Sequence, residues 1–196
     1  MDSAVRYAQS KDVLLVHAAG NENENVDSIP NFPSPDLLFN NQKVSNYITI
    51  GANGDPAIGS GNTIAEFSNY GAKSVDLFAP GVNIYSTLPG GNKYGNLSGT
   101  SMAAPVVSGI AALIRSYYPH LSARQVIYAL EKSVIPGTAM EGKITIPGTD
   151  KEVNMLDLCV TGGEVNALNA LKIAAKLKPE NLNNPKDTGQ RKSGKN

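Results

Sequence analysis

Tyr94-Gly-Asn-Leu-Ser-Gly-Thr-Ser101-Met-Ala-Ala-Pro-Val-Val-Ser-Gly-Ile-Ala-Ala-Leu-Ile114 is the stretch that decides how this 196-residue chain folds. It places Ser101 where a glycine-rich loop turns into a long apolar helix. At the start of a helix, unpaired backbone N–H groups and the helix dipole favour negative charge. A serine that attacks a carbonyl carbon creates an oxyanion beside itself, so it needs such a setting. Ser101 is therefore our candidate nucleophile, and the competing interpretation is a serine that only caps the helix.

The residues around Ser101 form the first of several segments that resemble one protein family. Gly99-Thr-Ser-Met-Ala-Ala-Pro105 resembles the nucleophile motif of the subtilisin-like serine proteases, or subtilases. Val13-Leu-Leu-Val-His-Ala-Ala-Gly-Asn-Glu22 is similar to the strand and turn that carry the family's oxyanion-hole asparagine. Residues 75–88 are similar to its strand pair leading to the serine, and residues 162–171 to its closing helix. The segments occur in the family's order, and the resemblance extends to about residue 178.

The resemblance implies a set of site residues. Asn21 would donate a side-chain N–H to the oxyanion, with the backbone N–H of Ser101 as the second donor; the competing interpretation is a turn asparagine. The remaining residues would contact the substrate: Ala18, Ala19 and Gly20 as one wall of the primary specificity pocket, Phe32 and Pro33 as a pocket-lining pair with a cis peptide bond as an option, and Gly99 and Thr100 beside the nucleophile.

Cofactor chemistry is not expected. Asp76 matches an acidic position that helps to hold a weak cation in some subtilases, but one carboxylate is not a metal site. We therefore assign no metal ligand and no required cofactor, and leave open a structural calcium in the full-length domain. Other serine-enzyme signatures fail, because Ala103 breaks Gly-x-Ser-x-Gly and Ala104 breaks Ser-x-x-Lys. An unrelated α/β hydrolase is thereby disfavoured.

The general base that a serine nucleophile needs is not evident in this sequence. His17 lies inside an apolar segment, and His120 follows the nucleophile helix, roughly 28 Å from Ser101 by helix rise. In the family the acid and the histidine precede the asparagine strand, so both would lie upstream of Met1. We expect a serine endopeptidase acting through an acyl-enzyme on Ser101, inactive without its N-terminal half. The alternative is a non-catalytic pseudoprotease or peptide-binding module.

Hydrophobic patterning predicts the order of the elements. An unbroken apolar strand after a helix is typical of a parallel sheet covered on both faces. We expect an α/β protein with the subtilisin-like three-layer fold and a mainly parallel sheet, lacking the N-terminal strands and helices of that fold. The expected helices cover 2–10, 100–118, a helix after a capping box at 122–125, and 165–177, with Val165, Leu168, Leu171 and Ala175 facing inward. The expected strands cover 13–18, 47–51, 64–67, 75–78 and 83–87.

Domain limits and partners follow from composition and from the resemblance. Residues 1–178 would be a partial subtilase catalytic domain with a hairpin at about 134–158 that turns at 148–150, and residues 179–196 a disordered basic tail. The chain has 17 basic and 17 acidic residues, which does not favour nucleic acid as a partner. No apolar run reaches the roughly 20 residues that a membrane span requires. The expected partners are a protein or peptide substrate and the missing half. No signal peptide is evident, and the family resemblance implies a secreted or periplasmic location.

Overall fold

The central element of the molecule is a five-stranded sheet. The structure, a computed structural model, describes residues 1–38, 42–55, 64–136 and 144–180. The strand order is β1-β4-β5-β11-β8, in which the first four strands run parallel and β8 is antiparallel to β11. The strands are β1 (Leu15–Ala18), β4 (Tyr47–Asn53), β5 (Leu77–Pro80), β11 (Gly163–Glu164) and β8 (Ile135–Pro136). The predicted mainly parallel sheet is confirmed.

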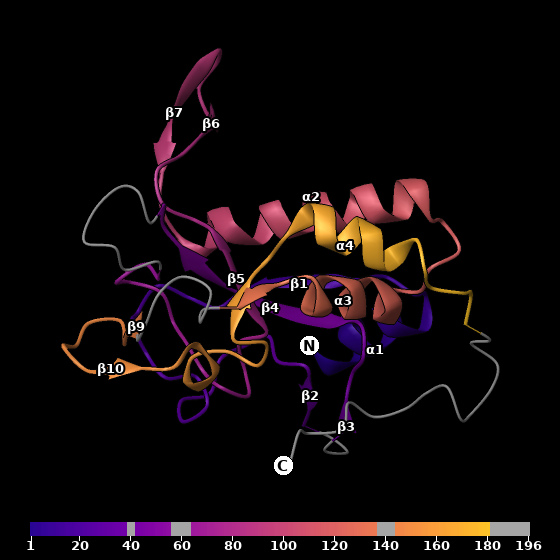
Figure 1. Cartoon of the computed structure of the whole chain (residues 1–196), viewed down its shortest axis with the longest axis horizontal. Helices are drawn as coiled ribbons and strands as arrows, with labels where there is room; N and C mark the ends of the chain where they lie inside the picture. Colours follow the sequence, from indigo (N-terminus) through magenta and orange to yellow (C-terminus); the bar gives the residue numbers. More distant parts are fainter. Residues whose placement is uncertain (39–41, 56–63, 137–143, 181–196) are drawn as a thin grey trace.

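Helices cover the sheet as two outer layers. The longest, α2 (Thr100–Tyr117), lies with α3 (Ala123–Lys132) and α4 (Ala167–Ala174) on one face (Figure 1). Their apolar side chains pack on Ile48, Ile50 and Ala52 of β4. Side chains alternate along a strand, so Tyr47 points to the other face, where it packs with Val5 of α1 (Asp2–Ser10). The three-layer α/β architecture is therefore confirmed.

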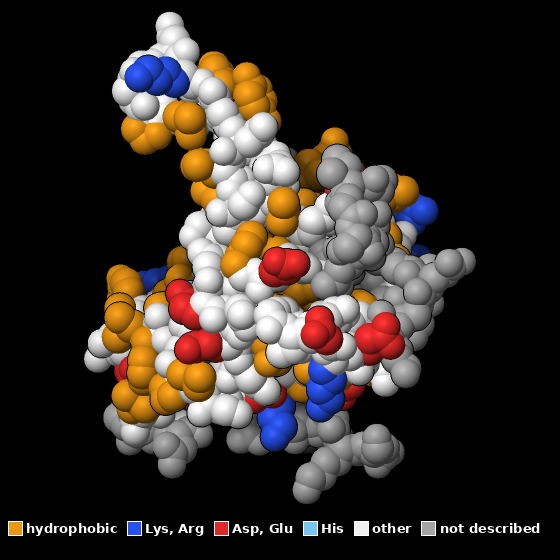
Figure 2. All heavy atoms as spheres, turned by 90° about the vertical axis from the view of Figure 1, so that its left-hand side faces the viewer, with side chains coloured by type: hydrophobic (Ala, Val, Ile, Leu, Met, Phe, Trp, Pro, Cys, Tyr) orange, Lys and Arg blue, Asp and Glu red, His pale blue; other side chains and the backbone are white. Residues whose placement is uncertain are grey.

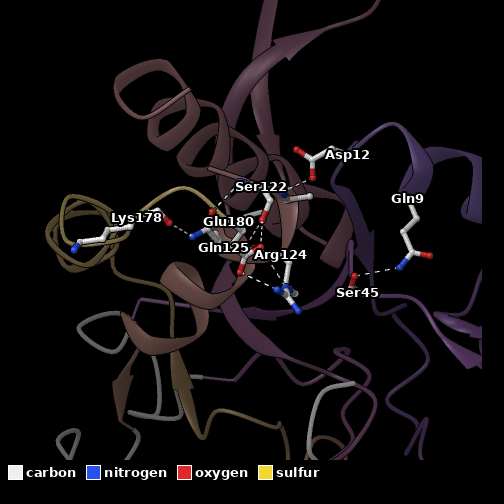
Figure 3. Close-up of polar contacts among 9 residues, drawn as sticks. Gln9, Asp12, Ser45, Ser122, Arg124, Gln125, Lys178 and Glu180 are labelled. Atoms are coloured by element: carbon white, nitrogen blue, oxygen red, sulfur yellow. Dashed lines mark hydrogen bonds and ion pairs between the residues drawn. The ribbon is translucent and has the colours of Figure 1, made fainter. Parts of the chain in front are cut away.

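The N-terminus of α3 joins several distant segments (Figure 3). The predicted capping box is present: the Ser122 hydroxyl accepts from the Gln125 backbone N–H, and the Gln125 side chain accepts from the Ser122 N–H. The Asp12 carboxylate accepts from the Ala123 N–H at 2.7 Å and pairs with Arg115 at 2.7 Å. The Glu180 carboxylate accepts from the Ser122 hydroxyl at 2.8 Å. Glu180, assigned to a tail from the sequence, is thus fixed against α3, while residues 181–196 of that tail lie outside the described part.

Short antiparallel pairs complete the fold. β9 (Ile144–Thr145) pairs with β10 (Glu152–Val153), which confirms the hairpin predicted to turn at 148–150, and the 3-10 helix η2 (Met155–Asp157) follows. β2 (Asp36–Leu37) pairs with β3 (Gln42–Lys43). β6 (Ile84–Leu88) pairs with β7 (Lys93–Leu97), and this hairpin projects from the body with hydrophobic side chains along it (Figures 1 and 2).

Four details of the sequence-based expectation were wrong. Residues 94–97, expected as loop, form strand β7, because they pair with β6 residue by residue. Residues 64–67 contribute only an isolated bridge between Ile64 and Asn53. Helix α2, whose sequence is apolar nearly all round and so predicts a helix buried on every side, buries one side only, and Leu113 on the other side is 40% exposed. Of the residues expected to face inward near α4, Val165 and Leu171 pack against the core, but Leu168 is 62% exposed and the buried residues are Ala170 and Ala174.

Strand β1 also differs from its prediction. Its four residues are half-buried rather than covered on both faces. The reason is its place at the edge of the sheet, since within the described residues it pairs only with β4.

Candidate functional site

Ser101 is the second residue of α2 and is exposed. The helix start is held by the turn after β5, because the Gly99 N–H donates to the Gly81 carbonyl at 2.8 Å. Gly81 is needed there: a Cβ at this position would lie 2.7 Å from the Ala52 Cβ and 2.8 Å from the Gly99 oxygen. Ser101 lies at the surface next to this contact, and the N–H groups of Met102 and Ala103 that follow it both donate to the Gly99 carbonyl, at 2.9 and 3.3 Å.

Asn21, which follows β1, lies against the same helix start. Its Oδ1 accepts from the Thr100 backbone N–H at 2.8 Å and from the Thr100 hydroxyl at 3.0 Å. The Thr100 hydroxyl in turn accepts from the Gly20 N–H at 3.1 Å. These bonds join segments 79 and 80 residues apart and hold the carboxamide oxygen toward Thr100. The Nδ2 group then lies over Gly99, 3.4 Å from the position a Cβ there would take. The structure thus brings Asn21 to the residue immediately before Ser101.

The expected pocket residues are only partly brought together. Ala19 is buried, and Ala18 and Gly20 are half-buried. The peptide bond between Phe32 and Pro33 is cis. These two residues line a cavity of about 470 Å³ beneath residues 26–36, whose lining includes none of residues 18–21 and not Ser101. A link exists through Asn31, whose Nδ2 donates to the Ala19 carbonyl at 2.5 Å.

Two side chains that the sequence did not single out support the loop carrying Asn21. Asn31 is one, and the other is Asn69, which is 2% exposed. The Asn69 carboxamide contacts the loop at the Ala19 carbonyl and at three points of Glu22 and Glu24. The only local signal is an asparagine between Ser68 and Tyr70 at the end of an apolar stretch, which is equally typical of a turn. Its partners lie 45 to 50 residues away, so sequence periodicity could not identify them.

Neither histidine lies beside Ser101. His17 lines the cavity beneath residues 26–36, and burial lowers the pKa of its imidazole. Its ring contacts Tyr47, at 5.6 Å between centroids. His120 lies beyond the C-terminal end of α2, next to the Tyr118 ring, whereas Ser101 lies at the N-terminal end. Both histidines thus lie on elements other than the helix start that carries Ser101.

Asp76 is a buried structural carboxylate in this fold. It is 4% exposed, and its Oδ2 accepts from the Thr49 N–H at 2.7 Å. The part of the chain that the structure describes contains no group of three or more His, Cys, Asp or Glu side chains placed to hold a metal. Cys159 is fully buried, and this burial raises the pKa of its thiol. No described helix is both long and apolar enough to cross a bilayer.

Comparison with known proteins identifies relatives of this chain. A model of the Subtilase family matches residues 1–175. The chain is 43% identical over 117 residues to the Major intracellular serine protease of Bacillus subtilis (strain 168), which covers 60% of this chain and 33% of that protein. It is 40% identical over 126 residues to Subtilisin DY of Bacillus licheniformis, with 64% of this chain and 41% of that protein covered.

Solved structures give the same result. The self-cleaved protease domain of PatA superposes with a TM-score of 0.61 at 26% identity, covering 89% of this chain and 54% of that one. The PatG macrocyclase in complex with peptide gives 0.61 at 26% identity, covering 88% and 47%. The chain therefore spans between one third and about half of the length of these proteins.

Proposed function

Since the chain belongs to the subtilase family of serine proteases, we propose that it supplies the nucleophile and one oxyanion donor of a serine-type endopeptidase. Ser101 is the proposed nucleophile and Asn21 the proposed donor. The observation that supports both roles is the 2.8 Å hydrogen bond from the Thr100 N–H to the Asn21 Oδ1, which places the carboxamide at the helix start carrying Ser101.

The proposed reaction proceeds through an acyl-enzyme. The Ser101 Oγ attacks the carbonyl carbon of the scissile peptide bond and gives up its proton to a base. The carbonyl oxygen becomes an oxyanion that accepts hydrogen bonds from the Asn21 Nδ2 and the Ser101 backbone N–H. The intermediate collapses as the amine leaves with the proton, and water then hydrolyses the ester by the reverse sequence. The Thr100 contact orients Asn21 before substrate arrives, so little reorganisation is needed during the reaction.

The base and its orienting acid are proposed to come from outside these 196 residues. His17 and His120 both lie away from Ser101, and the chain covers only 33% and 41% of two related proteases. Below, the term "complete domain" means this chain joined to the part of a subtilase domain that the chain does not span. Alone, the 196 residues are expected to hydrolyse no peptide, because nothing accepts the Ser101 proton. Secretion or periplasmic location remains a prediction from the family resemblance.

Labelling with a fluorophosphonate probe tests the proposal. In the complete domain the probe should label wild type and Ser108→Ala, a control on the exposed side of the same helix, and should not label Ser101→Ala. The 196 residues alone should stay unlabelled. Labelling that survives Ser101→Ala would contradict the nucleophile assignment. A complete domain that stays unlabelled but binds peptide would favour the alternative, a non-catalytic peptide-binding module.

A further inference from the structure

The Asn69 side chain uses all of its hydrogen-bonding capacity to hold residues 19–24, the loop that follows β1. Its Nδ2 donates to the Ala19 carbonyl at 2.9 Å and to the Glu22 carboxylate at 2.7 Å. Its Oδ1 accepts from the backbone N–H of Glu22 at 3.1 Å and of Glu24 at 2.8 Å. A carboxamide offers two donors and two acceptor positions, so all four are engaged. The partners lie on both sides of Asn21 in the sequence.

The backbone around Asn69 adds to the same attachment. The Asn69 N–H donates to the Gly20 carbonyl at 3.0 Å, and the Tyr70 N–H donates to the Glu24 carbonyl at 3.0 Å. The Ser68 hydroxyl donates to the Asn69 carbonyl at 3.0 Å and accepts from the Ala52 N–H at 2.9 Å, which ties the segment to strand β4. Ser68 and Asn69 are 0% and 2% exposed. The loop is thus attached to a buried segment that is itself bonded to the central sheet.

Asn21 itself is exposed, and its side chain is bonded to Thr100 at the start of α2. Its position therefore depends on Thr100 on the helix side and, on the loop side, on Asn69, which makes four side-chain hydrogen bonds to the loop, and Asn31, which makes one. Thr100 bonds the Asn21 carboxamide directly, whereas Asn69 touches only the residues on either side of it. A loop held at one side alone could shift Asn21 relative to Ser101, and displacements of about 1 Å can lower catalysis about 100-fold.

We propose that Asn69 is the positioning residue for Asn21: its carboxamide fixes residues 19–24 so that the Asn21 side chain stands over the N-terminus of α2. The inference rests on the proposed function, since Asn21 is the proposed oxyanion donor. Asn69 contacts neither substrate nor the reacting atoms and acts through the backbone of the loop.

Asn46 provides a matched control. It is also an asparagine, also 2% exposed, and its Nδ2 donates to the Val13 carbonyl at 2.7 Å at the opposite end of the β1 segment. Asn46→Ala therefore removes a buried carboxamide bonded to the same segment without touching the Asn21 loop. A general loss of stability should appear in both alanine variants, whereas a positioning effect should appear only in Asn69→Ala. Asn69→Asp, nearly the same size, is the second variant if Asn69→Ala does not fold.

Kinetics of the complete domain on a peptide 4-nitroanilide give the first readout. Asn69→Ala should lower kcat about 10- to 100-fold with KM within about twofold, and Asn46→Ala should change neither by more than about twofold. In a double-mutant cycle, Asn69→Ala should add little to Asn21→Ala, since it acts through that residue. Equal kcat in the two alanine variants, or additive losses in the cycle, would overturn the proposal.

Amide hydrogen exchange at Thr100 gives a readout that does not require activity. The Thr100 N–H is bonded to Asn21, so release of the loop should speed its exchange in Asn69→Ala and Asn69→Asp but not in Asn46→Ala. If the wild-type complete domain shows no Ser101-dependent hydrolysis, the proposed function fails while this measurement still decides the role of Asn69. Unchanged exchange at Thr100 in both Asn69 variants would overturn the positioning role.

Discussion

At the scale of single residues, Thr100 is the contact between the two halves of the proposed site. Its hydroxyl accepts from the Gly20 N–H and donates to the Asn21 Oδ1, and the residue is only 1% exposed. A hydroxyl that both donates and accepts can align two partners at once. The side chain thus sets the position of the loop and the orientation of the carboxamide together.

Thr100→Val should damage both functions of that hydroxyl. The Gly20 N–H loses its partner in a half-buried site, which typically costs about 1–3 kcal/mol of unfolding free energy. The kcat of the complete domain should also fall, but by less than it falls when the Asn21 donor is removed. In subtilisin, removal of the corresponding asparagine lowers kcat about 100- to 1000-fold. Urea unfolding and peptide hydrolysis measure the two effects. Thr100→Ser keeps both hydrogen bonds and should retain most of the stability; equal losses in the two variants would contradict the argument.

Some residues of the proposed site could be predicted from the sequence, and others could not. Ser101 and Asn21 were predicted because each sits in a local motif, at a strand end or a helix start, and the structure joins their segments. Asn69 and Asn31 were not, because their roles arise from hydrogen bonds to a loop that they do not belong to. The cavity beneath residues 26–36 was not foreseen either, since it depends on how an irregular loop crosses the sheet.

At the scale of elements, the pairing of β11 beside β5 leaves the carboxylate of Glu164 half-buried at the sheet. The Glu164 side chain is hydrogen-bonded to that of Asn53 on β4. Burial raises the pKa of Glu164, and the bond to Asn53 opposes this in part. Glu164 Oε1 and Asn53 Oδ1 are both buried without a hydrogen-bond partner. Two unpartnered acceptors and a raised pKa favour the protonated acid, whose single proton could satisfy an acceptor.

This carboxylate should make stability depend on pH in a defined direction. Because its pKa is raised on folding, the unfolded chain loses its proton first, and stability falls as pH rises from the ordinary value of 4.5 through the folded-state pKa. Glu164→Gln cannot ionise, and its amide can donate to Asn53. The unfolding free energy of the variant minus that of wild type should therefore increase as the pH rises through this range. Above the folded-state pKa this difference should be constant.

Urea unfolding of the complete domain at several pH values between about 4 and 8 measures the effect. The exposed Glu66→Gln variant is the control and should follow the wild-type curve. Parallel curves for wild type and Glu164→Gln would show that Glu164 is not the source of the pH dependence.

Element prediction succeeded where the signal was local and failed where tertiary contacts decide. The capping box at Ser122 was readable because both partners lie within four residues. The inward face of α4 was predicted only in part: Leu171 packs against the core, but the small Ala170 and Ala174 are the buried residues and the larger Leu168 faces outward. Strand β7 was missed since its glycine and asparagine disfavour strands, yet five cross-strand partners in β6 hold it in place.

At the scale of the whole molecule, apolar surface is left uncovered. Within the described residues β1 pairs on one side only, and Leu113 on the outer side of α2 is 40% exposed. The β6–β7 hairpin carries Tyr85 and Tyr94, 70% and 60% exposed, with their ring centroids 6.0 Å apart in a stacked arrangement. Open strand edges and contiguous apolar patches favour association with other protein surfaces.

The 196 residues expressed alone should therefore self-associate. Light scattering at increasing concentration should show growing particles, and replacing exposed apolar side chains, as in Leu113→Gln combined with Tyr85→Ser, should reduce the growth. Ser116→Gln, on an already polar position of α2, is the matched control and should leave the scattering unchanged. A wild-type chain that stays monomeric at high concentration would contradict the prediction, and co-expression with the remaining part of the domain should remove the association.

The bond between Asn21 and Thr100 has a consequence for the order of folding. It joins residues that are 79 positions apart, so its formation closes a long loop that contains strands β4 and β5. Long-range closures of this kind are slow steps, because their entropy cost precedes their reward. We therefore expect the contact that orients Asn21 to form late in folding, and a chain whose site is assembled late would not cleave its still unfolded neighbours.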